Sequence, residues 1–209
     1  MGDTVAMQFA RLGSEHEADV LRVMGEAFAQ DDAFKRVLLC QKTGLAGYFE
    51  ALLQLCWRAK DCHVFGGGSG ESVESAVVIF GPKFRAGLRG SMAYLHSYRR
   101  RLGLRRLMRL LAFGPRFERR ADLPQDCFHI QHLGTADRVR GQGLGGALLE
   151  YVCVEAAALG HEWVKLEVEV ESAARRFYLR HGFEAAGRFS LYQQAWDILV
   201  KNTKGSAGI

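Results

Sequence analysis

The chain has 209 residues, 48% of them hydrophobic, and 28 Lys and Arg against 23 Asp and Glu give a formal net charge of +5. This is enough for one domain with a full core, and no apolar run reaches the ~18 residues of a membrane span. The N-terminus lacks the pattern of a secretory signal, and five cysteines without a CxxC pair are typical of reduced thiols, so we expect a cytoplasmic protein without a metal site.

Apolar periodicity predicts two helices and a hairpin in the first part of the chain. Ser14 and Glu17 form a capping-box pattern at the start of the first helix. The glycine-rich stretch 66–70 reads as the turn of the hairpin. In chain order, the expected elements are a strand over 5–12, helices over 14–28 and 45–58, and hairpin strands over 62–66 and 73–80.

Residues 84–120 predict a basic helical insertion. Between Lys83 and Arg120 there are twelve Lys or Arg and one acidic residue, whereas the rest of the chain has 16 basic and 22 acidic residues. We expect breaks near Gly90 and Gly103, an apolar side that covers the core and an arginine side. The apolar side would include Leu88, Met92, Leu95, Leu102 and Leu107, and the basic side Arg99, Arg100, Arg101, Arg105, Arg106 and Arg109.

The second part of the chain predicts alternating strands and helices. The expected elements are strands over 127–135 and 163–170, helices over 147–159 and 172–181, two final strands around Gly187 and over 191–198, and a flexible polar tail over 201–209. A glycine-rich turn, Gly141–Gly146, separates the first of these strands from the helix after it. Such a turn presents free backbone N–H groups at the positive end of a helix dipole, which is a ready site for phosphate.

Three interpretations of this turn remain from the residues alone. The spacing Gly141-x-Gly143-x-x-Gly146 matches a dinucleotide-binding fingerprint, with Glu167 near the end of the next strand. Against it, the preceding loop is long and only about 60 residues follow the motif. The glycines can also serve close helix packing without any ligand. In the third interpretation, the turn binds the phosphate group of another cofactor.

Two motifs favour that third interpretation. Arg140-x-x-Gly143-x-Gly145 and Phe177-Tyr178-x-x-x-Gly182-Phe183 together resemble the Gcn5-related N-acetyltransferase (GNAT) superfamily. The resemblance implies an α/β fold with a mixed central sheet flanked by helices, and the basic helical insertion preceding the cofactor-binding strand. It implies one acetyltransferase domain over 1–200 with an acetyl-CoA-binding core over 127–183.

The same resemblance implies how acetyl-CoA is held. The pyrophosphate would bind the N–H groups of Gly141–Gly146, with Arg140 and Arg138 nearby, and the end of strand 127–135 would pair with the pantetheine arm. An N–H of Leu133 or Gly134 would polarise the thioester carbonyl, and a bulge at Gly134 would open the sheet. The implied cofactor-binding residues are Leu133, Gly134, Thr135, Arg140, Gly141, Gln142, Gly143, Leu144, Gly145 and Gly146.

Tyr178 and Glu167 are the implied catalytic residues. A hydroxyl at Tyr178 can protonate the leaving thiolate, although a tyrosine that only packs under the cofactor is the alternative. Glu167 is the first candidate for the base or for an amine-binding carboxylate, with a solvated glutamate as the alternative. His129 and His132, expected on opposite faces of their strand, are weaker candidates for the base.

We therefore expect direct acetyl transfer to an amine of a small molecule or peptide, and the C-terminal strands are compatible with a homodimer. The alternative is a non-catalytic module on the same fold that senses acyl-CoA or binds nucleic acid. Nucleic acid is not the partner we expect, because the basic segment lacks interleaved aromatic residues. If the arginines lined the acceptor pocket, they would suit an acidic acceptor; otherwise they form a solvated face.

Overall fold

The computed structural model describes residues 7–31, 42–69, 72–85, 87–105, 107–108, 126–191 and 193–206. The strands are β1 (Met7–Arg11), β2 (Lys60–Ser69), β3 (Ser75–Arg85), β4 (Cys127–Thr135), β5 (Trp163–Glu169), β6 (Glu184–Leu191) and β7 (Gln194–Asn202). The helices are α1 (Glu17–Phe28), α3 (Lys42–Cys56), α4 (Gly87–Leu102), α6 (Leu144–Ala158) and α7 (Ala173–Arg180), with short 3-10 turns at Ser14–His16, Asp137–Val139 and Thr203–Ser206.

The strands form one mixed sheet in the order β1-β2-β3-β4-β5-β7-β6. Only β4 and β5 run parallel, and the other five neighbouring pairs are antiparallel. A dinucleotide-binding domain has a mostly parallel, doubly wound sheet, so this topology excludes that interpretation of the glycine turn.

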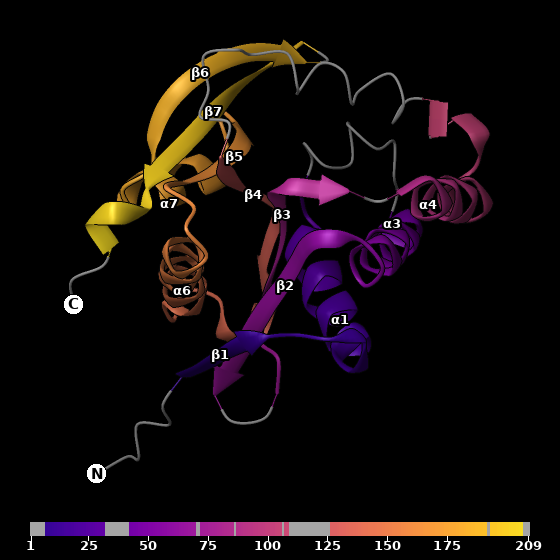
Figure 1. Cartoon of the computed structure of the whole chain (residues 1–209), viewed down its shortest axis with the longest axis horizontal. Coiled ribbons are helices and arrows are strands. Elements are labelled where there is room, and N and C mark those ends of the chain that lie inside the picture. The colour runs from indigo at the N-terminus through magenta and orange to yellow at the C-terminus, as the bar shows by residue number, and fades with distance from the viewer. Residues whose placement is uncertain are drawn as a thin grey trace.

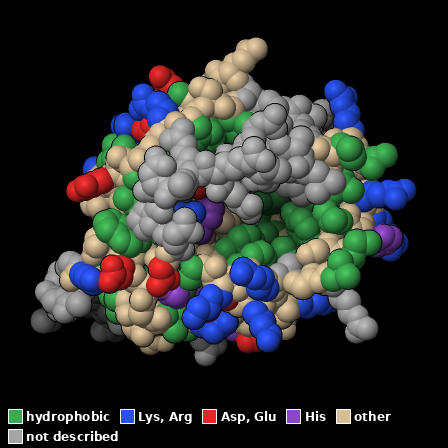
Figure 2. All heavy atoms as spheres, turned by 45° about the horizontal axis from the view of Figure 1, so that its top comes forward, with side chains coloured by type: hydrophobic (Ala, Val, Ile, Leu, Met, Phe, Trp, Pro, Cys, Tyr) green, Lys and Arg blue, Asp and Glu red, His purple; other side chains and the backbone are tan. Residues whose placement is uncertain are grey.

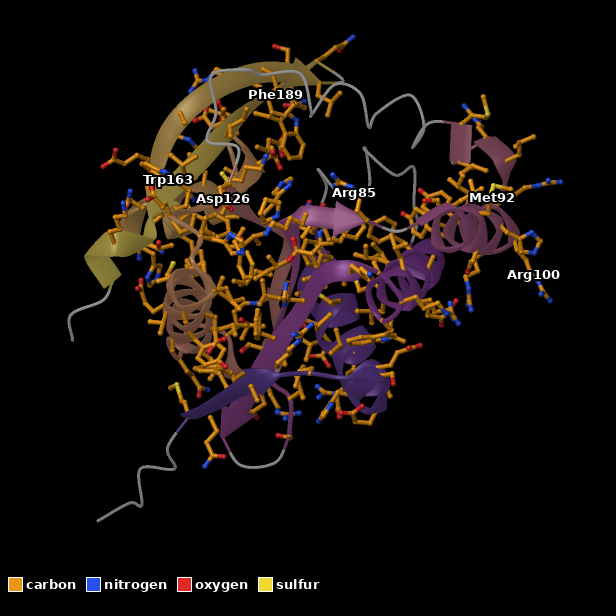
Figure 3. The ribbon with its side chains drawn as sticks, in the orientation of Figure 1. Arg85, Met92, Arg100, Asp126, Trp163 and Phe189 are labelled. Carbon is orange, nitrogen blue, oxygen red and sulfur yellow. The ribbon has the colours of Figure 1, made fainter. Side chains whose placement is uncertain are left out.

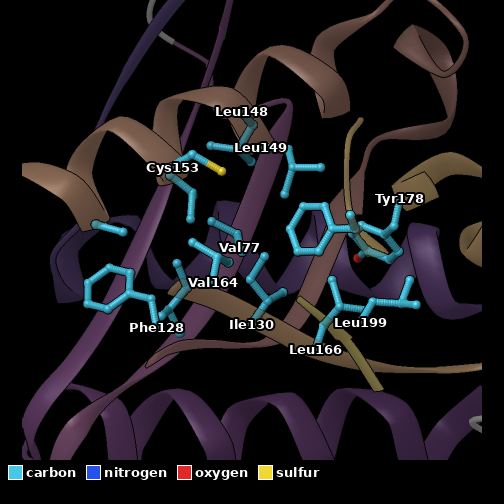
Figure 4. Packing of buried hydrophobic residues seen from close by; sticks show 14 of the residues in the cluster. Val77, Phe128, Ile130, Leu148, Leu149, Cys153, Val164, Leu166, Tyr178 and Leu199 are labelled. Atoms are coloured by element: carbon cyan, nitrogen blue, oxygen red, sulfur yellow. The ribbon is translucent and has the colours of Figure 1, made fainter. Parts of the chain in front are cut away.

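Helices cover both faces of the sheet (Figure 1). On one face, α6 and Tyr178 of α7 pack on a core that includes Phe128, Ile130, Leu166 and Leu199 (Figure 4). On the other face, α1 and α3 enclose a second apolar cluster, and α4 lies outside α3. None of the described helices has both the length and the apolar character needed to cross a bilayer.

The parallel strands β4 and β5 pair over three residues only, where Cys127–His129 lies beside Trp163–Lys165. Beyond this point β4 stays paired with β3, and β5 with β7. The two strands therefore leave an opening in the middle of the sheet, which reaches the C-terminal end of β4 and the glycine turn.

A β-bulge lies three residues before the position expected for it. The register of β3 and β4 shifts between Val78 and Ile79, which leaves Gln131 as the extra residue of β4. Gly134 has another role, since a Cβ there would lie 2.8 Å from Cβ of Ala27 in α1. The glycine therefore lets α1 approach the sheet closely, and the predicted bulge at Gly134 is wrong.

This bulge changes which side chains share a face. Phe128 and Ile130 face α6, so His129 between them faces α1 and α3. After the extra residue, His132 also faces α1 and α3, where its ring lies 5.3 Å from that of Phe49. The expectation that His129 and His132 lie on opposite faces is wrong because simple alternation ignores the bulge.

The glycine stretch after residue 65 belongs largely to a strand. β2 continues to Ser69. On one side, Gly66, Gly67 and Gly68 pair with β1, and on the other side Gly66 and Gly67 pair with β3. A Cβ on Gly67 would collide with the backbone of Gln8. Glycine is present here because two strands approach closely, whereas composition alone predicted a turn.

Three other boundaries differ from expectation. No side-chain capping bond forms at Ser14; α1 begins at Glu17, whose carboxylate accepts a hydrogen bond from Trp57 Nε1 at 2.9 Å. α4 continues through Gly90, while Gly103 ends it with a φ of +86°. β7 and a 3-10 turn extend into the predicted tail, and residues 207–209 lie outside the described part.

Candidate active site

The N-terminus of α6 presents a set of backbone donors. Gly141 and Gly143 have φ values of +82° and +85°, which glycine adopts without strain. The first hydrogen bond into the helix runs from Ala147 N to Gly143 O at 3.0 Å. Among the described residues, the N–H groups from Gly143 to Gly146 have no acceptor. This geometry fits the phosphate groups of a cofactor.

Two glycines of the motif also serve packing. A Cβ on Gly146 would lie 2.5 Å from Cε1 of His181, just after α7, and one on Gly145 would lie 3.0 Å from Oγ1 of Thr135. A larger residue at either position would therefore have to displace the side chain of His181 or of Thr135. Phosphate binding and packing are thus compatible roles, because the backbone N–H groups of Gly145 and Gly146 remain available while their missing side chains leave room for the neighbouring elements.

The arginines expected near the phosphates are engaged in ion pairs. Arg138 Nη2 lies 2.9 Å from Oε1 of Glu74, and Arg140 Nη2 lies 2.7 Å from Oδ1 of Asp137. Both partners of the Arg140 pair are largely exposed, so the pair is weak and the guanidinium can exchange it for a phosphate. Gln142 donates from Nε2 to the carbonyl of Arg138, and Leu144 is buried.

The end of β4 offers donors to the opening beside it. Ala136 N donates to Glu74 O at 2.8 Å, on the β3 side. Because backbone N–H groups alternate sides along a strand, those of Leu133 and Thr135 point toward the opening, and that of Gly134 points toward β3. Of the two amides expected to contact a thioester, only that of Leu133 has the required direction.

Tyr178 is buried on the α6 face of the sheet (Figure 4). Its ring lies 5.1 Å from that of Phe177 and 5.6 Å from that of Phe183. Burial raises the pKa of Tyr178 above its usual value, so the phenol keeps its proton at neutral pH. A group in this state can donate a proton and cannot act as a base.

Glu167 and His129 form a direct pair on the opposite face. Glu167 Oε2 lies 2.6 Å from His129 Nε2, just beyond the last paired residues of β4 and β5. Burial by itself would raise the pKa of Glu167, but the charge and hydrogen bond of His129 hold it below the usual value. The sequence indicated both residues as candidates, but only the structure shows their contact.

His132 lies in an aromatic environment and is poorly suited to be a base. Its Nε2 is 2.8 Å from the Tyr48 hydroxyl, and the rings of Phe28, Tyr48 and Phe49 surround it. Burial, with a smaller contribution from the charge of His129, lowers the pKa of His132 to about 3. His132 is therefore neutral at physiological pH and does not accept a proton there.

A buried carboxylate that the sequence analysis missed fixes α7. Asp197 in β7 is 1% exposed and accepts a 2.7 Å hydrogen bond from Arg175 Nε in α7. It also accepts 2.6 Å and 3.2 Å bonds from Arg188 in β6. Since α7 carries Tyr178, this ionic cluster positions that phenol. An isolated Asp in a strand pattern gives no sequence signal for such a role.

The face that carries Glu167 also has an aromatic wall. Glu169 lies opposite Trp196, and Trp196 lies opposite Phe189, so the three side chains share this face. The rings of Phe189 and Trp196 stack with centroids 6.3 Å apart. Figure 2 is turned so that the top of Figure 1 comes forward, and it shows a hollow with many hydrophobic side chains.

The three consecutive arginines of α4 do not act together. Arg101 forms an ion pair with Glu50 of α3, whereas Arg99 and Arg100 are exposed. Figure 3 shows Arg100 projecting from α4 away from the sheet. The hypothesis that these arginines select an acidic acceptor therefore gains no support from their geometry.

Comparisons with known proteins agree with this arrangement. Residues 115–185 match the family described as acetyltransferase (GNAT) domain, and a search of curated proteins returns no match. A histone acetyltransferase HPA2-related structure from Corynebacterium glutamicum is 17% identical, with a TM-score of 0.65, covering 94% of this chain and 96% of the other.

Two further solved structures are similar over nearly their whole length. Arylalkylamine N-acetyltransferase 2 from Aedes aegypti is 14% identical, with a TM-score of 0.62, covering 94% of this chain and 99% of the other. Ribosomal-protein-S18-alanine N-acetyltransferase from Escherichia coli is 13% identical, with a TM-score of 0.57 and coverages of 95% and 94%. At these identities the likeness shows a shared fold.

Proposed function

We propose, from the premise that this chain belongs to the Gcn5-related N-acetyltransferase superfamily, that it transfers the acetyl group of acetyl-CoA directly to an amine of a small molecule or peptide. One observation carries the proposal. The opening between β4 and β5 has free amide donors at its end, the protonated phenol of Tyr178 on one face and the Glu167–His129 pair on the other. A transfer between two substrates needs these elements together.

The cofactor would be held by the end of β4 and the start of α6. The N–H groups from Gly143 to Gly146 suit the pyrophosphate, with Arg140 exchanging its partner Asp137 for a phosphate oxygen. The backbone of β4 from Leu133 to Thr135 suits the amides of the pantetheine arm, because none of the described strands pairs with the N–H groups of Leu133 and Thr135.

Acetyl-CoA, when bound, supplies an activated acetyl group as a thioester. The N–H of Leu133 would then polarise the thioester carbonyl, in the manner of an oxyanion hole. The Tyr178 hydroxyl would donate its proton to the leaving sulfur, since its raised pKa keeps that proton available at neutral pH.

The amine must lose a proton before or during its attack, because its free pKa lies near 10. We assign this task to His129, with Glu167 as the carboxylate that orients it. When the imidazole donates from Nε2 to Glu167, its Nδ1 lone pair is available to accept a proton. The aromatic wall of Phe189 and Trp196 favours an amine with an apolar substituent.

Ligand-dependent thermal unfolding tests the cofactor assignment. Acetyl-CoA and CoA at about 100 times Kd should add about 2.7 kcal/mol to the free energy of unfolding and raise Tm by several degrees, whereas NAD(H) should have no effect. A Tm unchanged by acetyl-CoA and CoA would refute the proposal.

Catalysis is then tested by the release of free CoA thiol with a panel of arylalkylamines, polyamines, amino acids and peptides. Amine-dependent formation of free CoA thiol by the wild-type protein supports the transferase. The Tyr178→Phe variant should bind CoA equally well but form the free thiol much more slowly. Tight acetyl-CoA binding with no release above the background without protein would identify a sensing module instead.

A further inference from the structure

On the outer side of α4 and of the turn after it, several large hydrophobic side chains are exposed and do not pack on the core. Tyr98, Leu102 and Leu107 are buried and attach this segment to Tyr48 of α3. Four other large hydrophobic side chains remain exposed. They are Leu88 at 81%, Met92 at 61%, Leu104 at 58% and Met108 at 58% exposure. The expectation that the apolar side of this segment is covered is therefore wrong for Leu88 and Met92, whereas Leu102 and Leu107 are buried as expected.

These side chains are arranged in two pairs, each separated by one helical turn. Leu88 and Met92 lie four residues apart in α4, and Leu104 and Met108 lie four apart after the φ +86° bend at Gly103. At about 100° per residue, Leu88, Met92 and Arg99 project within an arc of about 40°. Arg99 thus shares one side of α4 with the two apolar side chains, and Arg100, about 120° from Leu88, lies next to that side.

The same segment carries positive charge without any compensating acid. Residues 83–108 include eight Lys or Arg and no Asp or Glu. Arg99, Arg100 and Arg105 are exposed, and an ion pair between Arg101 and Glu50 joins this segment to α3. Figure 3 shows α4 with Met92 and Arg100 at one extremity of the molecule, with Arg100 projecting outward.

We propose that this surface, formed by Leu88, Met92, Arg99, Arg100, Leu104, Arg105 and Met108, docks on an anionic lipid bilayer. Leucine and methionine side chains can enter the boundary between headgroups and acyl chains, while arginines bind lipid phosphates. The absence of carboxylates removes the repulsion that an anionic surface would otherwise exert. This inference does not depend on the proposed acetyl transfer.

Two other partners fit this surface less well. Nucleic acid would use the arginines but leave the exposed Leu and Met side chains without contacts, and Tyr94 and Tyr98, which could stack on bases, pack against each other and toward α3. A symmetric dimer through this surface would bring Arg99 and Arg100 of one copy close to the same residues of the other, which is unfavourable.

Vesicle co-sedimentation of the full chain tests the proposal. We expect binding to vesicles of phosphatidylcholine with phosphatidylglycerol, little binding to phosphatidylcholine alone, and weakening as salt rises. The double variants Leu88→Ser with Met92→Ser, and Arg99→Gln with Arg100→Gln, should each reduce the bound fraction about tenfold or more. Their Tm should equal that of the wild type, because the four side chains are exposed.

Matched variants on other helices serve as controls. Val154→Ser with Leu159→Ser changes two hydrophobic residues, 50% and 52% exposed, in α6 and directly after it, and Arg176→Gln with Arg180→Gln removes two exposed arginines of α7. Both controls should bind vesicles as the wild type does. Absence of binding, equal binding to neutral vesicles, or equal loss in the controls would overturn the proposal. So would a dimer in ultracentrifugation that Leu88→Ser with Met92→Ser dissociates.

Discussion

At the scale of single residues, the Glu167–His129 pair lies at the point where β4 and β5 separate. Burial raises the pKa of Glu167, but the charge and hydrogen bond of His129, with a smaller contribution from Lys165, together lower it below the usual value, so the carboxylate is ionised at neutral pH. An ionised carboxylate 2.6 Å from an imidazole fixes its tautomer and stabilises it once protonated. Glu167 therefore acts through His129 in the mechanism we propose.

The substitution Glu167→Gln should lower kcat/KM by about 100-fold, because the amide keeps the size of the side chain but not its charge. The double variant Glu167→Gln with His129→Asn should be no slower than the slower single variant, since the two residues act as one unit. Glu169→Gln, on the same face of β5, is the control and should retain most activity. Independent, multiplicative losses in steady-state kinetics would contradict the pairing.

The substitution Tyr178→Phe should lower kcat by about 100-fold or more and leave the Kd of CoA unchanged. The ring keeps its contacts with Phe177 and Phe183, so the fold is preserved. Tyr151→Phe removes a phenol that packs against the same core and should have little effect. Calorimetric titration with CoA and initial-rate kinetics distinguish proton donation from packing under the cofactor. Weaker CoA binding with an unchanged kcat would show that Tyr178 only packs.

At the scale of elements, α7 is held by charge as well as by its apolar side. Asp197 is buried between Arg175 of α7 and Arg188 of β6. The hydrogen bond of Arg188 lowers the pKa of Asp197, burial opposes this, and Arg175 lowers it further. The position of Tyr178 thus depends on a carboxylate in another element.

The substitution Asp197→Asn should reduce the free energy of unfolding by about 3 kcal/mol, because it leaves two arginines without their buried counter-charge. For a domain of this size, Tm should fall by about 6 to 12 °C at pH 7. Because the folded-state pKa is lowered, the wild-type advantage is present above about pH 4 and disappears as pH falls further. Thermal unfolding at several pH values measures this change.

Glu162→Gln, which removes an ion pair with Lys204 in which both side chains are exposed, is the control for that experiment and should shift Tm little. A Tm loss for Asp197→Asn that persists unchanged at low pH would contradict an electrostatic origin. We also expect Asp197→Asn to lower kcat, since α7 carries Tyr178, the phenol that we propose as the proton donor.

Local patterns predicted most elements because their residues agree with their environment. The strand before the glycine turn and the helix after it follow from apolar periodicity, and Ser172 caps α7 through a 3.1 Å bond from Arg175 N. The bulge at Gln131 and the close approach at Gly67 depend on the neighbouring strand. A single sequence does not show which strand lies beside which or in what register, so these two features could not be predicted.

At the scale of the whole molecule, the two candidate catalytic groups lie on opposite faces of one sheet. Tyr178 packs with Leu166 on the α6 face, while Glu167, the next residue of β5, points to the α1 and α3 face. The sequence indicated both residues, but it could not indicate that the gap between β4 and β5 connects them. That relation depends on how few residues the two strands pair.

The short pairing of β4 and β5 also means that the protein carries sheet edges in its interior. From Ile130 on β4 and Leu166 on β5, the backbone groups facing the opening have no partner strand within the described part of the chain. Unpaired edges exchange amide hydrogens readily and can add a strand from another molecule. We expect Leu133 and Thr135 to exchange quickly until acetyl-CoA is added, and the ligand-free protein to be the form that aggregates; hydrogen exchange and light scattering, with and without acetyl-CoA, would measure both.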